Sequence, residues 1–158
     1  MVFPKHSGMK KIFLLALISL SACSVPPGAV RKIIATDQAP KAIGPYSQAV
    51  KVGDMMWLAG QLGLTPDGQL VSGGIEAETK QVMENISAVL RAAGMNFSQV
   101  VQVNVFLADL SEFQKFNTVY GSYFPSDPPA RSTVQVAALP RNARVQIAVT
   151  AVIHTIRK

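Results

Sequence analysis

The stretch from Ile75 to Leu107, IEAETKQVMENISAVLRAAGMNFSQVVQVNVFL, combines two hydrophobic patterns. In its first part apolar residues recur every three or four positions, as in an amphipathic helix, and Gly94 ends that pattern. Its last part, Val100–Leu107, alternates β-branched and polar residues, which is typical of a strand. A helix followed by a strand is therefore predicted. The apolar residues at helical spacing are Ile75, Val82, Met83, Ile86, Val89, Leu90 and Ala93.

The residues before this stretch predict three short strands. Arg31–Ala35 is the first candidate, and a loop rich in Pro, Gly and Ala follows it. Gln48–Val52 and Met55–Leu58 flank Gly53-Asp54, an arrangement that favours a hairpin.

The residues after this stretch predict one helix and two more strands. Ser111–Gln114 has the form of a capping box and opens a segment with three aromatic residues on one helical face. Arg131–Ala138 and Arg144–Ile156 are strand candidates, and Arg131 is expected on the polar face of the first. The expected order is β-β-β-α-β-α-β-β, an α+β domain in which two helices cover one face of a sheet. The three aromatic residues are Phe113, Phe116 and Tyr120.

The sheet face that the helices leave open has an unusual composition. In Val100–Leu107, one side carries Val101, Val103, Val105 and Leu107, and the other carries Val100, Gln102, Asn104 and Phe106. The last strand repeats this contrast, with Gln146, Ala148, Thr150, Val152 and His154 on the second side. A half-apolar face of this kind favours burial against another subunit, with its polar groups lining a cleft at the junction.

The N-terminal residues form a separate unit. Lys10 and Lys11 precede a short apolar run, and small residues lead to Cys23, the single cysteine of the chain. This is the pattern of a secretory signal, and Leu20–Cys23 resembles the lipobox of bacterial lipoproteins. We therefore expect a signal peptide at 1–22, a lipid-anchored tether at 23–30 and one domain at 31–158.

Three further points concern this N-terminal unit. Met9 is the expected start, because residues 1–8 add nothing to the signal pattern. Ser24 after the cysteine favours the outer membrane, facing the periplasm, with contact to the membrane through the lipid alone. The alternative is a buried N-terminal helix of a cytoplasmic protein.

Charge and composition exclude several classes of protein. The formal net charge of the 158 residues is +6, but residues 1–22 hold three of the fifteen Lys and Arg and no Asp or Glu. The remaining chain is close to +3, so no nucleic-acid partner is expected. One cysteine and two histidines exclude a disulfide framework and a Cys/His zinc cluster. His154 is expected to be structural rather than a general base.

Several motifs then occur in a fixed order. They are AIGPYSQA at 42–49, LAGQ at 58–61, VFLADL at 105–110, FNTVY at 116–120 and PARS at 129–132. In these motifs the chain resembles the Rid family (YjgF/RidA/L-PSP) over roughly Lys32–Ile153. The resemblance implies a chorismate-mutase-like homotrimer with three ligand clefts between subunits. It also implies hydrolysis of reactive 2-imino acids, or their enamine tautomers, to 2-keto acids and ammonia, with no metal or organic cofactor.

The resemblance assigns roles to five residues. Arg131 matches the arginine that binds the substrate carboxylate, and a guanidinium suits this role because it offers two parallel donors to a planar anion. Tyr46 matches a tyrosine that lines the cleft, and Gly60 would present its backbone N–H to the ligand. Asn117 and Thr133 match further substrate-binding positions. The alternatives are a surface salt bridge for Arg131, a core position for Tyr46 and structural roles for Asn117 and Thr133.

Two positions depart from the family pattern. Gln146 replaces the glutamate that is proposed to hold and activate the hydrolytic water, and an amide cannot act as a base at neutral pH. Ala59 replaces a serine. The catalytic candidates are therefore Arg131 and Gln146. Three hypotheses follow: a Rid-type deaminase, a non-catalytic homologue that binds a small carboxylate, and a ribonuclease, which the L-PSP name suggests and which we rank last.

Overall fold

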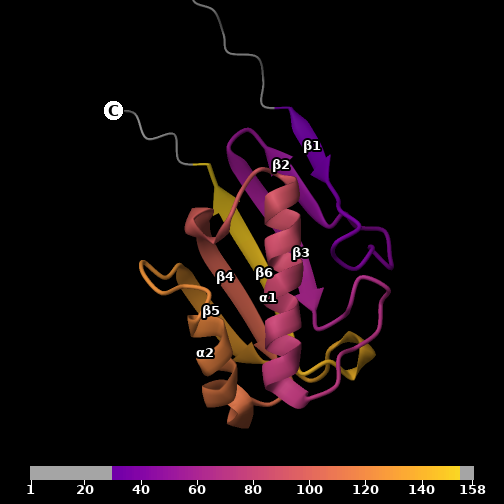
Figure 1. The fold of residues 1–158 in the computed structure, drawn as a ribbon, viewed down its shortest axis with the longest axis vertical. Coiled ribbons are helices and arrows are strands. Elements are labelled where there is room, and N and C mark those ends of the chain that lie inside the picture. Colours follow the sequence, from indigo (N-terminus) through magenta and orange to yellow (C-terminus); the bar gives the residue numbers. More distant parts are fainter. Residues whose placement is uncertain (1–29, 154–158) are drawn as a thin grey trace, which may run out of the picture.

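The computed structural model describes residues 30–153, and the predicted signal peptide, Cys23 and His154 lie outside this range. The chain forms one sheet with both helices on the same side (Figure 1). No helix in the described range is long and apolar enough to cross a membrane. The main elements are β1 (Arg31–Ile34), β2 (Ala49–Val52), β3 (Met55–Leu62), α1 (Gly74–Ala92), β4 (Val100–Leu107), α2 (Phe113–Gly121), β5 (Ala130–Gln135) and β6 (Val145–Val152).

The strands lie in the order β1-β2-β3-β6-β4-β5. All neighbouring pairs are antiparallel except β4 and β5, which are parallel and are joined through α2. The C-terminal strand β6 thus lies between β3 and β4, the two strands that α1 connects. The predicted element order and the coverage of one face by two helices are confirmed.

The main core lies between the helices and the sheet. The helix α1 contributes five residues with 0% exposure to this core, which confirms the predicted helical face. They are Val82, Met83, Ile86, Val89 and Leu90. Every second residue of β6 from Val145 to Ala151 is buried in the same core. Burial of these apolar surfaces is the main force that holds the layers together.

The face of the sheet opposite the helices, here called the open face, is half apolar and largely uncovered. Trp57 and Met55 of β3 are 45% and 41% exposed, and Val134 of β5 is 47% exposed. At one end the β5–β6 loop covers this face, where Leu139 and Ala143 pack with Leu62 and Leu64 in a second small cluster. Exposed apolar residues over neighbouring strands are the composition expected of an interaction surface.

Two sequence predictions about these faces were wrong. Val100 lies in the main core and not on the open face, because an irregularity in the β4–β6 pairing falls between Val100 and Gln102 and reverses the alternation. Arg131 lies on the helix side of β5 and not on a polar face, because it pairs in parallel register with the buried Val103.

The predicted capping box was also wrong. The short 3₁₀ turn Leu110–Glu112 precedes α2, and the side chain of Asp109 caps this turn by accepting a hydrogen bond from the backbone N–H of Ser111 at 2.8 Å. The helix α2 begins at Phe113 without a side-chain cap. The predicted aromatic face of α2 is confirmed, since Phe116 and Tyr120 are buried there.

Candidate functional site

A β-bulge in β3 brings Gly60 against Gln146. Leu58 pairs with Val149 and Gln61 with Ile147, so Ala59 and Gly60 together lie opposite one residue of β6. The side chain of Gln146 occupies the space beside Gly60, where an added Cβ would come within 2.8 Å of Gln146 Cδ. Only glycine fits here without displacing the glutamine.

Buried polar groups stabilise this irregular strand end. The side-chain amide of Gln61 donates to the carbonyl of Ala59 at 3.0 Å. From α1, the Asn85 amide donates to the carbonyls of Leu62 and Leu64 at 3.1 and 2.8 Å. These bonds satisfy backbone groups that the bulge and the strand end leave without ladder partners.

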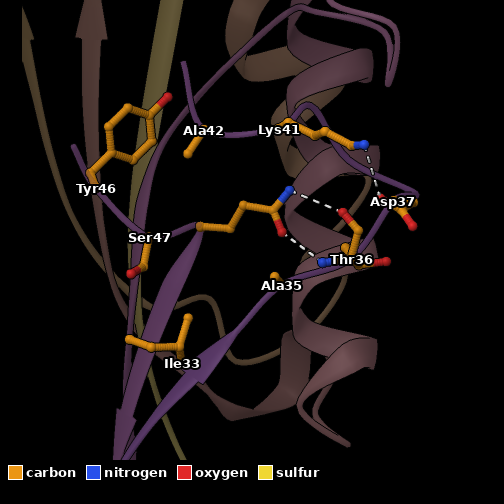
Figure 2. Close-up of a pocket in the computed structure, with 9 residues that line it drawn as sticks. Ile33, Ala35, Thr36, Asp37, Lys41, Ala42, Tyr46 and Ser47 are labelled. Atoms are coloured by element: carbon orange, nitrogen blue, oxygen red, sulfur yellow. Dashed lines mark hydrogen bonds and ion pairs between the residues drawn. The ribbon is translucent and has the colours of Figure 1, made fainter. Parts of the chain in front are cut away.

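Tyr46 reaches the same region from the loop between β1 and β2. Gln48 holds this loop in place: its Oε1 accepts from the backbone N–H of Thr36 at 2.7 Å, and its Nε2 donates to the carbonyl of Thr36 at 3.0 Å (Figure 2). The same Nε2 also donates to the carbonyl of Pro40 at 2.8 Å. The Tyr46 ring is half exposed and separates two hollows. One, of about 430 Å³, lies along Ile33, Thr36 and Gln48.

The second hollow beside Tyr46 gathers three predicted site residues. It has a volume of about 370 Å³ and is lined by Tyr46, Gly60 and Gln146, together with Ile43 and Pro140. The backbone N–H of Ile43 donates to the Tyr46 hydroxyl at 3.3 Å, which holds the ring in the loop. We call Tyr46, Gly60 and Gln146 the glycine half-site.

Arg131 and Asn117 lie together in a different hollow, of about 480 Å³, between α2 and the start of β5. The Arg131 guanidinium lies over three rings of α2, with Cζ 5.6 Å from the centroid of Phe113, 5.5 Å from Phe116 and 4.7 Å from Tyr120. It forms no salt bridge with any of the described residues. The guanidinium is thus supported on its face, and no acidic side chain among the described residues takes up its donors. We call Arg131 and Asn117 the arginine half-site.

Thr133 lies two residues beyond Arg131 on the same side of β5. It is half-buried, and its hydroxyl oxygen is buried without a hydrogen-bond partner among the described residues. It does not line the hollow of Arg131. The chain therefore places Thr133 beside the arginine half-site.

A single chain does not bring the two half-sites together. Gln146 pairs with Phe106 of β4, which pairs with Val134 of β5, so these three residues face the open side of the sheet. Arg131 faces the helix side, and β4 lies between its strand and β6. A ligand that touches both Arg131 and Gln146 therefore needs two copies of the chain.

A buried carboxylate supports the loop next to the glycine half-site. Glu78 of α1 accepts a hydrogen bond from the backbone N–H of Arg144 at 2.7 Å, immediately before β6. The Arg144 side chain lies 4.0 Å from the Glu78 carboxylate and 2.8 Å from Glu112. Burial raises the pKa of the Glu78 carboxyl, and the bonds from Arg144 oppose this shift.

Sequence reasoning did not assign a site role to the rings under Arg131. The signal was present, because Phe113, Phe116 and Tyr120 occur at helical spacing on α2, but it predicted core packing alone. Pro140 and Ile43, which line the same hollow as the glycine half-site, were also missed, because both come from loops whose paths the sequence does not fix. Among residues 30–153 there is no group of three His, Cys, Asp or Glu side chains that could hold a metal ion.

Comparison with known proteins identifies the family. A sequence model described as Endoribonuclease L-PSP matches residues 36–153, nearly all of the described domain. The chain belongs to the Rid/L-PSP family. Protein DfrA of Myxococcus xanthus is 54% identical over 125 residues, which are 77% of this chain and 95% of that protein. The 2-iminobutanoate/2-iminopropanoate deaminase of Bos taurus is 53% identical over 124 residues, 78% of this chain and 90% of that protein.

Solved structures of the family have the same fold. A protein described as an endoribonuclease from Thermotoga maritima is 49% identical, with a TM-score of 0.76 over 78% of this chain and 98% of that chain. Escherichia coli TdcF, whose structure contains bound serine, is 36% identical, with a TM-score of 0.75 over 78% of this chain and 99% of that one. The predicted chorismate-mutase-like fold is confirmed by these matches.

Proposed function

We propose that this protein is a Rid-type deaminase that hydrolyses small 2-imino acids to 2-keto acids and ammonia. Its curated relatives include several proteins named 2-iminobutanoate/2-iminopropanoate deaminase, at about half identity and over nearly their whole length. The observation that carries the proposal is the stacked Arg131 guanidinium, which lacks an acidic partner among the described residues. A guanidinium held against aromatic rings without an acidic partner is suited to binding a carboxylate.

The site of this reaction is formed by two subunits. Arg131 of one subunit would hold the substrate carboxylate, and Asn117 lies beside it to accept or donate one further hydrogen bond. The imine carbon would be enclosed by the glycine half-site of a neighbouring subunit, which consists of Tyr46, Gly60 and Gln146. The exposed apolar residues of the open face, with Trp57 as the largest, supply the surface for this association. A homotrimer, as the family resemblance implies, provides three such sites.

The chemistry requires one water molecule and no cofactor. The water oxygen attacks the imine carbon, the carbon–nitrogen bond breaks, and ammonia leaves as the 2-keto acid forms. Gln146 can orient this water through its amide but cannot take its proton at neutral pH. The proton therefore goes to the imine nitrogen or to the substrate carboxylate that Arg131 holds.

The direct test uses purified protein and a 2-imino acid generated in the same vessel by an amino acid oxidase. We expect the 2-keto acid to be released faster with the protein than without it. The Arg131→Ala variant should lose this acceleration. Equal rates with and without the protein would contradict a deaminase function.

A second candidate function is binding of a small carboxylate without catalysis. Gln146 and Ala59 favour it, because both replace hydroxyl or carboxyl groups of the family pattern by groups that cannot act as a base. Calorimetric binding of a 2-keto acid without any acceleration of imine hydrolysis would support this candidate against the first. Ribonuclease activity remains third, since the described domain offers neither a basic stripe nor a catalytic histidine pair.

The location outside the cytoplasm is a further proposal that depends on Cys23. Lipidation of Cys23 after removal of residues 1–22 would place the domain at the periplasmic side of the outer membrane. Cys23→Ser should abolish acylation and release the domain into the soluble fraction. A wild-type protein that is soluble and retains residues 1–22 would contradict this location.

A further inference from the structure

Arg131 is supported by aromatic rings on one side only. Its guanidinium lies closest to Tyr120, whose ring centroid is 4.7 Å from Cζ, and the rings of Tyr120 and Phe116 pack 5.3 Å apart beneath it. A guanidinium has five N–H donors, and a bidentate carboxylate uses two of them. Rings alone fix the plane of the group, but they do not fix its rotation within that plane.

Tyr120 carries a hydroxyl that packing does not explain. The residue is 5% exposed, and its hydroxyl oxygen is buried without a hydrogen-bond partner among the described residues. A phenylalanine would fill the same space and stack equally well under the guanidinium. A buried hydroxyl without a partner lowers stability, so its presence needs another explanation.

The buried polar atoms without partners are not scattered at random. The described residues contain four side chains with such an atom, and two of them, Tyr120 and Thr133, lie next to Arg131. Burial raises the pKa of the Tyr120 hydroxyl and the Arg131 guanidinium opposes the shift, so the hydroxyl is neutral at physiological pH. A neutral hydroxyl oxygen beside a guanidinium can accept one of its N–H groups.

We propose that Tyr120 is a positioning residue whose hydroxyl accepts an N–H of Arg131 when the ligand carboxylate binds, and so orients the guanidinium for bidentate binding. The inference rests on the proposed function, because it assumes that Arg131 binds that carboxylate. The rings of α2 set the plane of the guanidinium, and the Tyr120 hydroxyl sets its rotation. The Tyr120 hydroxyl acts on the ligand only through Arg131, since its oxygen is buried.

The test compares Tyr120→Phe with wild type and with Tyr123→Phe. Tyr123 is a matched control because it follows the same helix but packs against Phe97, at 5.5 Å between ring centroids. We expect Tyr120→Phe to weaken calorimetric binding of 2-ketobutanoate about tenfold, the size of one hydrogen bond to a charged group. Binding of 2-ketobutanamide, which has no carboxylate, should not change. Tyr123→Phe should change neither affinity.

Thermal unfolding distinguishes positioning from a structural role. Because the hydroxyl is unpartnered in the free protein, Tyr120→Phe should leave the melting temperature unchanged or raise it. A lower melting temperature would mean that the hydroxyl stabilises the fold, and it would overturn the proposal. An unchanged affinity for 2-ketobutanoate would overturn it as well.

Arg131→Ala separates this inference from the proposed function. If Arg131→Ala abolishes 2-ketobutanoate binding while Tyr120→Phe has no effect, only the role of Tyr120 is wrong. If Arg131→Ala itself leaves binding unchanged, the carboxylate site is wrong and the inference falls with it.

Discussion

Arg131 and Gln146 lie on opposite faces of one sheet, with strand β4 between their strands. Arg131 projects to the helix side over the rings of α2, and Gln146 projects to the open side beside Gly60. No side-chain movement brings both to one ligand within a chain. In the proposed function both residues act in one site, which then takes one half-site from each of two subunits.

This relationship predicts complementation between two defective chains. Arg131→Ala removes the arginine half-site, and Gly60→Ala disturbs the glycine half-site by displacing Gln146. Each homo-oligomer should fail to bind 2-ketobutanoate, whereas co-expressed chains should regain about a quarter of the sites, because each needs two undamaged halves drawn from neighbouring subunits. Calorimetry gives the number of sites. No recovery in verified mixed oligomers would contradict a shared site.

The role of Arg131 predicts a strong dependence on the shape of its head group. Arg131→Ala should weaken binding of a small 2-keto acid by about 30- to 1,000-fold, the size of a charge-assisted pair in a buried cleft. Arg131→Lys should lose nearly as much affinity, since the point charge of an ammonium cannot form two parallel hydrogen bonds to the carboxylate. Isothermal calorimetry measures both. Binding by the lysine variant at wild-type strength would argue for simple charge attraction.

Gln146→Glu tests how the hydrolytic water is activated. A carboxylate beside the bound substrate can take a proton from water, so the variant should hydrolyse 2-imino acids faster than wild type. Gln146 is half-buried at the edge of its hollow, so fold and oligomeric state should be retained. Keto-acid release at equal protein concentration is the measurement. An unchanged rate would assign water activation to another group, such as the substrate carboxylate.

The Gly60–Gln146 contact predicts a non-additive pair of substitutions. A Cβ at residue 60 would overlap the flexible end of Gln146, so Gly60→Ala should displace that side chain with little loss of stability. Its effect on ligand binding should therefore be large alone and small when Gln146 is already alanine. A double-mutant cycle in binding free energy measures this coupling. Additive effects would mean that Gly60 acts independently of Gln146, for example through its backbone N–H.

Glu78 predicts a specific pH dependence of stability. Burial raises its pKa in the folded protein above the ordinary value of 4.5, so folding favours the protonated form. The contribution of this group to stability is therefore greatest below about pH 4.5 and declines as the pH rises through the folded-state pKa. Glu78→Gln retains an oxygen that can accept the Arg144 N–H but cannot ionise.

The measurement for Glu78 is the difference in unfolding free energy between wild type and Glu78→Gln at several pH values. Wild type should lose stability relative to the variant as the pH rises from 4 to 7. The opposite trend would mean that the Arg144 interactions outweigh the burial of the carboxylate.

Local sequence patterns were sufficient to predict the elements of the fold. The helical spacing between Ile75 and Ala93 and the strand alternation in β6 are short-range signals, and the structure confirms both. Such patterns determine which side chains are buried, because each helix or strand has one apolar face that packs against the core, away from water. The same patterns predicted two helices on one face of one sheet.

Only the tertiary structure decided which face each site residue occupies. One pairing irregularity moved Val100 into the core, and the parallel pairing of β5 with β4 turned Arg131 toward α2. Strand register depends on partners far away in the chain, and a shift of one residue exchanges the two faces. The sequence by itself determined the candidate residues and their chemistry, because these follow from residue type and motif. Their division between two half-sites on opposite faces of the sheet was determined by strand order and register, which no local segment encodes.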